Sequence, residues 1–220
     1  MTETMKHFKL RTDLTIKVGE KTLYRIEATK DIEKFGIKAG DLGGYIEKED
    51  NLSGNAWVSG DARVYGNAWV SGDALVSGDA WVSGYALVYE NAKVSGDALV
   101  SGDAEVSGDA EVSGDAEVYG NAKVSGDALV SGDARVSGDA RVYGDKIEKE
   151  NDLVNITSNV GSYNITITPK NIKIGCQYHS KTAWFKFTED EIRKMDGQKA
   201  VDWWKTWKPI LKSICDGLKQ

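Results

Sequence analysis

The sequence predicts a mainly β protein whose centre is a parallel β-helix, because a unit of six residues repeats through the middle of the chain. Alanine recurs every six residues from Ala56 to Ala140, and a valine stands two residues after each of these alanines. The commonest form of the unit is Ala-x-Val-Ser-Gly-Asp. Alternating residues followed by a Gly-Asp turn are typical of short strands and corners, whereas an amphipathic helix needs apolar residues about 3.6 apart. Hexapeptide periodicity of this kind indicates a parallel β-helix.

Three repeats complete one triangular coil, so residues 18 apart stack directly and the 15 repeats make about five regular coils. The outward residue between each alanine and valine tests this arrangement. Opposite charges become neighbours at Lys93 and Glu111, and apolar residues become neighbours at Trp69 and Leu87. Cross-strand pairs of these kinds stabilise a sheet by about 0.2–1 kcal/mol each. We expect a left-handed coil, which is an exception to the right-handed rule for parallel crossovers.

The chain divides into three predicted domains. Residues 1–45 alternate as strands do and then become rich in glycine, which predicts a small β cap over the open end of the β-helix. Residues 46–145 contain the hexapeptide-repeat β-helix, whose register fails after Tyr143. Residues 146–220, with 13 basic and 9 acidic side chains, predict an α+β domain that ends in a helix rich in tryptophan and lysine.

Composition excludes several classes of protein. The 34 acidic and 28 basic side chains give a net charge of -6, which argues against a nucleic-acid binder driven by phosphate attraction. Two cysteines, Cys176 and Cys215, are too few for a disulfide scaffold. The sequence contains neither an apolar run of membrane-spanning length nor the apolar core of a signal peptide. We therefore expect a folded cytoplasmic protein without a membrane partner.

Two resemblances follow from the residues. The Ala-x-Val-x-Gly-Asp/Asn-Ala run resembles the hexapeptide-repeat superfamily of left-handed β-helices, which includes acyltransferases and gamma-class carbonic anhydrases. Three stretches resemble hexapeptide-repeat proteins of bacteriophages and prophages: Leu23 to Ile26, Gly40 to Ile46, and Ile174 to His179 with the following Trp-Lys-Pro helix. The second resemblance covers nearly the whole chain and implies a protein of the bacterial host cytoplasm.

The catalytic residues of the enzyme relatives have no counterparts here. Acyltransferases of the superfamily use a coil histidine as general base, and the carbonic anhydrases use three histidines around a metal. This chain has only His7 and His179, both outside the repeats, so we predict no catalytic residue, no cofactor and no enzymatic activity. Cys176 and His179 with Cys215 offer three zinc ligands without an evident fourth, and we therefore commit to no metal site.

The candidate binding residues are apolar side chains in places where solvent is expected. Six of them point outward from the first coils of the β-helix: Trp57, Trp69, Trp81, Leu75, Leu87 and Leu99. Exposed apolar patches usually mark contacts with partners. Three more lie beside lysines in the C-terminal helix: Trp203, Trp204 and Trp207. These three have alternative interpretations as a platform for stacking nucleotides, as an oligomer contact or as domain core.

The corner aspartates also leave two interpretations open. One row stacks the residues Asp61, Asp79, Asp97, Asp115 and Asp133. Such a ladder is suited to binding cations or mimicking a phosphate backbone, but aspartate also satisfies the backbone of a tight corner.

The function that we expect is binding or assembly without catalysis. Hexapeptide prisms commonly trimerise, so the resemblance implies a homo-oligomer, with a trimer favoured. A phage protein of this kind is expected to antagonise host defence by binding a host protein or by sequestering a small nucleotide signal. The alternatives are a divergent hexapeptide-repeat acyltransferase and a structural component of the virion.

Overall fold

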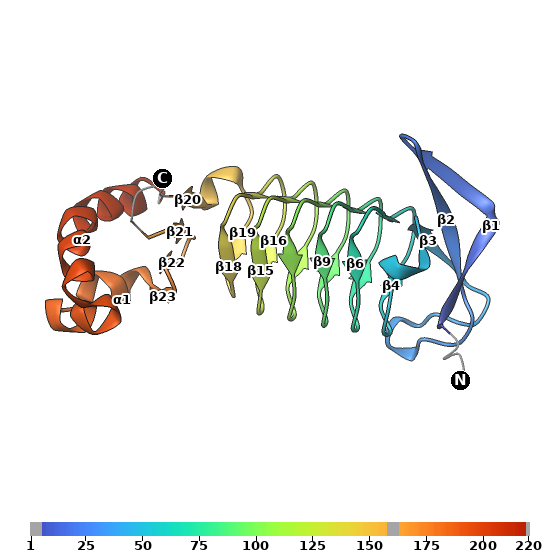
Figure 1. Ribbon diagram of the computed structural model, residues 1–220, viewed down its shortest axis with the longest axis horizontal. Helices are drawn as coiled ribbons and strands as arrows, with labels where there is room; N and C mark the ends of the chain where they lie inside the picture. Colours follow the sequence, from blue (N-terminus) through green and yellow to red (C-terminus); the bar gives the residue numbers. More distant parts are fainter. Residues whose placement is uncertain (1–5, 158–162, 219–220) are drawn as a thin grey trace.

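The computed structural model describes residues 6–157 and 163–218. A β-solenoid forms its centre, an N-terminal hairpin lies at one end, and a small domain with the helices lies at the other end (Figure 1). The two termini therefore lie at opposite ends of the molecule (Figure 1).

Three strands of the N-terminal cap lead into the solenoid. They are β1 (Phe8–Val18), β2 (Lys21–Ala28) and β3 (Leu42–Ile46). They pair antiparallel in that order, and β3 then pairs in parallel with the solenoid strand β5, so the cap sheet continues directly into one face. The connections contain the short 3-10 helices η1 (Glu33–Phe35) and η2 (Glu49–Asn51).

The solenoid has three faces of stacked parallel strands. Face A continues from β3 through β5 (Arg63–Val64), β8 (Trp81–Val82), β11 (Leu99–Val100), β14 (Glu117–Val118) and β17 (Arg135–Val136). Face B consists of β4 (Trp57–Val58), β7 (Leu75–Val76), β10 (Lys93–Val94), β13 (Glu111–Val112), β16 (Leu129–Val130) and β19 (Lys146–Ile147). Face C consists of β6 (Trp69–Val70), β9 (Leu87–Val88), β12 (Glu105–Val106), β15 (Lys123–Ser125) and β18 (Arg141–Tyr143).

The register and the core confirm the predicted parallel β-helix. Partners such as Lys93 and Glu111 are 18 residues apart, which is the predicted length of one coil. Every repeat valine is fully buried, and no repeat alanine is more than 2% exposed. Face B stacks six solenoid strands, and the cap strand β3 extends the five of face A to six, so the prism is about one coil longer than the regular repeats alone.

The corners require a backbone that glycine adopts easily. Gly102 has a φ of 70°, and a Cβ there would lie 3.0 Å from the backbone nitrogen of Gly120 in the next coil. Glu90 stands at one such corner with a φ of 62°, the one non-glycine with a positive φ within residues 6–157 and 163–218. Its carboxylate accepts a hydrogen bond from the Gly108 backbone N–H at 2.7 Å, which offsets part of the strain.

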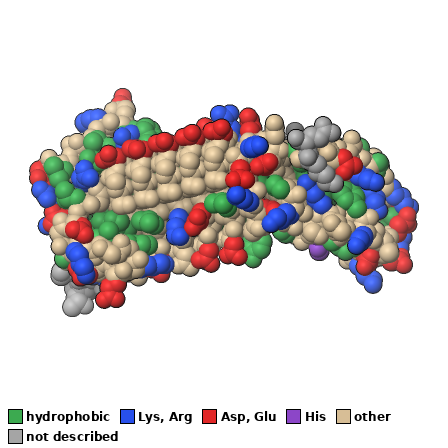
Figure 2. Space-filling model, turned by 180° about the vertical axis from the view of Figure 1, so that it is seen from behind, with side chains coloured by type: hydrophobic (Ala, Val, Ile, Leu, Met, Phe, Trp, Pro, Cys, Tyr) green, Lys and Arg blue, Asp and Glu red, His purple; other side chains and the backbone are tan. Residues whose placement is uncertain are grey.

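The corner carboxylates line the outside of the solenoid. A row of acidic side chains follows one edge, and basic side chains are more frequent at the C-terminal end (Figure 2). In rows that mix the two residue types, an asparagine amide donates to the aspartate of the next coil, as Asn91 does to Asp109 at 3.0 Å. The corner side chains thus bond to one another as well as facing solvent.

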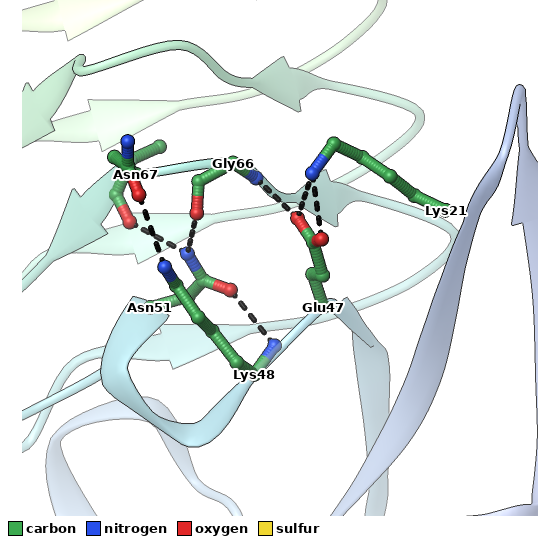
Figure 3. Close-up of polar contacts among 7 residues, drawn as sticks. Lys21, Glu47, Lys48, Asn51, Gly66 and Asn67 are labelled. Carbon is green, nitrogen blue, oxygen red and sulfur yellow. Dashed lines mark hydrogen bonds and ion pairs between the residues drawn. The ribbon is translucent and has the colours of Figure 1, made fainter.

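A polar network joins the cap to the first coils (Figure 3). It involves the six labelled residues Lys21, Glu47, Lys48, Asn51, Gly66 and Asn67. The fully buried Asn51 amide donates to the Ala68 carbonyl at 2.8 Å, and the Glu47 carboxylate accepts the Gly66 N–H at 2.6 Å. Burial raises the pKa of Glu47, but hydrogen bonds from Lys21 and Gly66 outweigh it and lower that pKa overall. The network satisfies backbone groups where the regular coils begin.

The predicted loss of register after Tyr143 is a slip of one residue that keeps the coil. Leu129 pairs with Lys146 and Val130 pairs with Ile147, so these partners are 17 residues apart rather than 18. Asp145 takes the position of a repeat alanine, and its carbonyl accepts the Leu129 N–H at 2.8 Å. Ile147 then takes the valine position and is fully buried.

The C-terminal domain has its own sheet and core. After η3 (Glu150–Asp152), the strands β20 (Val154–Ile156), β21 (Ile165–Ile167), β22 (Asn171–Ile174) and β23 (Gln177–Ser180) form an antiparallel sheet in sequence order. The helices α1 (Lys181–Lys186) and α2 (Glu189–Gly217) pack on it. Neither helix has the length and hydropathy to cross a membrane within the described part of the chain.

The long helix α2 begins and bends where local sequence dictates. A capping box forms at its start, since the Thr188 hydroxyl accepts from the Glu191 N–H and the Glu191 carboxylate accepts from the Thr188 N–H. Asp196 and Gly197 leave the helical conformation, with Gly197 at a φ of 68°. The helix thus consists of two segments joined by a kink.

Candidate functional site

Five of the six predicted apolar side chains of the first coils reach the surface of the solenoid. Trp69 is the most exposed of them at 43%, and the others are partly buried: Leu75, Trp81, Leu87 and Leu99. The neighbouring corner residue Tyr85, between the faces A and C, is 63% exposed. The sequence signal for Tyr85 was available, because it replaces the usual corner aspartate or asparagine.

The prediction that Trp57 belongs to the exposed surface is wrong. Trp57 is fully buried because the N-terminal segment covers it. The buried ring of His7 lies 6.4 Å from that of Trp57, and its Nε2 donates to the Ala56 carbonyl at 2.8 Å. Burial is the main cause of the lowered pKa of His7, with a smaller contribution in the same direction from Lys30.

A second part of the N-terminal cap, around η1 (Glu33–Phe35), also contacts the solenoid beside face B. Phe35 and Leu75 both pack against the solenoid core. Lys34 donates to the Asn91 side-chain oxygen at 2.7 Å and lies 3.1 Å from the Asp73 carboxylate, so it ties the segment to two successive corners. The flank therefore folds back over one face in cis.

The solenoid strands of face A begin with a cation–π contact between neighbouring coils. The Arg63 guanidinium lies 4.8 Å from the ring centroid of Trp81, and Tyr65 meets that ring edge-on at 6.2 Å. Such cation–π contacts contribute about 0.5–1 kcal/mol at exposed sites. Leu99 follows in the next coil, and the face ends in charged side chains.

Face C begins with Trp69, whose side chain is 43% exposed. The Trp69 indole N–H donates to the Ser53 hydroxyl at 2.9 Å, which fixes the half-exposed ring over the first coil. Leu87 stacks directly on Trp69, and Glu105 follows it with an ion pair to Lys123 at 2.6 Å. The apolar surfaces of the faces A and C thus meet across the Tyr85 corner.

The C-terminal domain contains an aromatic cavity of about 260 Å³. Four rings contribute to its wall: Tyr163, Trp184, Trp203 and Trp204. The Tyr163 hydroxyl donates to the Asp196 carboxylate at 2.6 Å, and burial together with this bond raises the pKa of Tyr163 to about 12. This cavity escaped the sequence analysis because strands and a helix kink far apart in the chain form it.

The three tryptophans of the C-terminal helix do not form an exposed platform. Trp204 is only 5% exposed and packs 5.4 Å from Trp184 in the core of the domain, so its prediction as a surface contact is wrong. Trp203 and Trp207 are partly buried and stack on each other at 5.4 Å. The side chains of Trp203 and Trp207 lie on the flank of the core, which an apolar stripe of a helix normally faces.

The three candidate zinc ligands have separate surroundings. Cys176 is exposed and Cys215 is buried. His179 packs edge-on against Trp184 at 5.3 Å and against Phe187 at 5.1 Å. Within residues 6–157 and 163–218 there is no group of three or more His, Cys, Asp or Glu side chains that could hold a metal ion.

A buried carboxylate joins the solenoid to the C-terminal domain. Asp145 is 2% exposed, and its Oδ2 accepts from the Thr168 hydroxyl, from the Asn171 amide at 2.7 Å and from the Tyr178 hydroxyl at 3.1 Å. Burial and the Asp145 charge raise the pKa of Tyr178. The residue that makes the register slip thus also anchors the next domain.

Comparison with known families finds matches in the solenoid. Residues 56–72, 68–84 and 134–150 match the family model of the YdcK beta solenoid repeat. The first two segments overlap in the first coils, and the third contains the register slip at Asp145. A comparison with curated proteins finds no match. The stacked faces and the repeat matches together identify the chain as a β-solenoid repeat protein.

Proposed function

We propose that the protein is a non-enzymatic binding protein that works as a homo-oligomer, with a trimer as the expected assembly. The observation that carries the proposal is the apolar surface of the faces A and C beside Tyr85. It contains Trp69, Leu87, Trp81 and Leu99, all at the N-terminal end of the prism. Single exposed apolar residues are ordinary, but a contiguous aromatic and aliphatic surface usually marks a contact.

A second copy of the chain suits this surface. Residues that are six apart on the faces A and C lie at about the same height along the prism axis. Trp81 is therefore level with Leu87, and Glu117 is level with Lys123. If face A of one copy meets face C of another with parallel axes, Trp81 faces Leu87 and Glu117 faces the opposite charge of Lys123, whereas Leu99 faces Glu105. Both copies rise by the same distance of about 4.8 Å per coil, so residues at equal levels stay opposite each other along the prism.

The last coils set a limit to this contact. Arg135 on face A would face Arg141 on face C, and like charges repel. We therefore place the contact at the first coils. Because face A meets a different face of its neighbour, the interface is heterologous, and a closed ring is the arrangement that leaves neither face A nor face C unpaired.

The absence of catalysis is part of the proposal. His7 is buried against Ala56 and Trp57, and His179 packs among aromatic rings of the C-terminal domain. Both positions serve packing rather than a general base beside an open cleft. For the biological role we propose antagonism of host defence in the bacterial cytoplasm, by binding a host protein or a nucleotide signal.

Light scattering on the purified protein at about 10 µM tests the assembly. We expect a mass near three times the 24.0 kDa of one chain. The double variant Trp69→Glu with Trp81→Glu should be a monomer, because charge would enter the apolar contact. The matched control is Glu111→Gln on face B, whose side chain is exposed. A monomeric unmutated protein would refute the assembly.

Two further measurements address the alternatives. Saturable binding of acyl-CoA, or acyl transfer to an amine acceptor, would support the divergent acyltransferase instead. Detection of the protein in purified virions in fixed stoichiometry would support the structural component.

A further inference from the structure

We infer that the aromatic cavity of the C-terminal domain binds a planar heteroaromatic ring whose edge carries hydrogen-bond acceptors, such as a purine base. The inference names a site and a ligand class for the binding function proposed above, and it rests on that function in this respect. The cavity lies in a separate core from the solenoid, so its occupancy does not depend on assembly.

The size and walls of the cavity limit the shape of the ligand. Its volume of about 260 Å³ lies just below the range of about 300–1,000 Å³ typical of ligand pockets, so the ligand is small. Ile174, Ile192 and Met195 supply aliphatic wall between the rings. Aromatic faces favour a flat guest, because stacking on such a ring contributes about 1–3 kcal/mol per base.

The walls are held in place before any ligand arrives. Trp203 lies between two other rings, edge-on to Tyr163 at 5.1 Å and stacked on Trp207 at 5.4 Å. Tyr163 comes from the sheet side and bonds to Asp196 at the helix kink, so two distant segments fix each other. A preformed site loses less entropy on binding than one that must first be ordered.

Two buried donors without partners determine the polarity of the ligand. The indole N–H groups of Trp203 and Trp204, both lining residues of the cavity, have no hydrogen-bond partner within the described residues. An indole nitrogen can only donate. Both nitrogens are closed to solvent in this structure, so a bound ring reaches them only if the indoles shift; acceptors on its edge would then satisfy them, and an apolar guest would leave them unsatisfied.

The rim of the cavity also carries hydrogen-bond acceptors. Asp196 and Gln177 both line the cavity and carry acceptor oxygens, which suit an amino group or ring N–H of the same ligand. Lys199 lies 5.5 Å from the centroid of the Tyr163 ring, on the exposed side of the helix kink. A purine combines a flat ring, edge acceptors and edge donors, and it is the class that these groups fit together.

The test is a titration of the full chain with adenosine, guanosine and indole, followed by calorimetry. We expect one of the nucleosides to bind at micromolar to submillimolar concentration, at least tenfold tighter than indole, because indole stacks but offers no acceptor. Trp203→Phe retains a ring and removes one N–H, and it should weaken nucleoside binding about tenfold. Trp69→Phe on the solenoid is the matched control and should leave the affinity unchanged.

A second readout avoids any variant in the domain core. Cys176 lines the cavity and is exposed, whereas Cys215 is buried, so alkylation of Cys176 should slow when the nucleoside is bound. Three results would overturn the inference: no saturable binding of either nucleoside up to millimolar concentration, indole binding as tightly, or unchanged alkylation at saturation. The monomeric Trp69→Glu, Trp81→Glu variant should still bind the nucleoside, so failure of assembly and failure of this site are distinguishable.

Discussion

Replacing Asp145 should loosen the C-terminal domain from the solenoid. In Asp145→Ala the Asn171 amide loses its carboxylate partner. The hydroxyls of Tyr178 and Thr168 keep second acceptors in the Tyr143 and Asn171 carbonyls. A buried unsatisfied donor costs about 1–3 kcal/mol, and each bond lost to a charged acceptor adds to this. Removing a buried charge returns part of that cost. We expect a net loss of about 2–4 kcal/mol in the free energy of opening the domain.

Hydrogen exchange followed by mass spectrometry measures this loss segment by segment. Peptides from residues 163–218 should exchange faster by roughly 30-fold to several hundred-fold, while peptides from the first coils stay unchanged. Asp145→Asn keeps an acceptor oxygen and should show a smaller effect. The control is Asp127→Ala, an exposed corner residue one coil earlier, which should change little. If Asp145→Ala exchanges like the unmutated protein, the carboxylate does not anchor the domain and our reasoning fails.

Three further predictions concern the cap and the corners. The pKa of His7 is lower in the folded protein than in the unfolded chain, so as the pH falls the unfolded chain binds a proton at a higher pH than the folded protein does. The stability of the cap should therefore be complete above about pH 6.5 and fall as the pH decreases below it. Thermal unfolding from pH 7.5 to pH 5 measures this, and a His7→Gln variant with the same pH dependence would contradict it. Gly102→Ala should lower the free energy of unfolding by about 2 kcal/mol or more in urea titrations, because φ is 70° and the new Cβ would lie 3.0 Å from Gly120; an unchanged midpoint would refute the corner argument. The free energy of unfolding of Glu90→Gly should stay within about 1 kcal/mol of that of the unmutated protein in the same titration, because the relief of backbone strain offsets the loss of the carboxylate bond to Gly108. A loss above about 2 kcal/mol would show that the bond dominates.

The repeat alone determined the architecture of the centre. Each valine of the unit meets the valine 18 residues later, so a contact that is distant in space has a fixed offset in sequence. The pairs Lys93 with Glu111 and Trp69 with Leu87 follow from the same offset. Periodic sequence therefore predicts register, core and outward stacking together, because each coil contacts only its neighbours.

Only the tertiary structure decided what covers the repeat and where it ends. Trp57 and Trp69 occupy equivalent outward positions, yet the segment around His7 buries the first and leaves the second exposed. Asp145 replaces a repeat alanine after a slip of one residue, which a search at fixed spacing reads as the end of the coil. The caps and the aromatic cavity depend on contacts with no repeating offset, such as Tyr163 with Asp196, and these contacts form only when the whole chain folds.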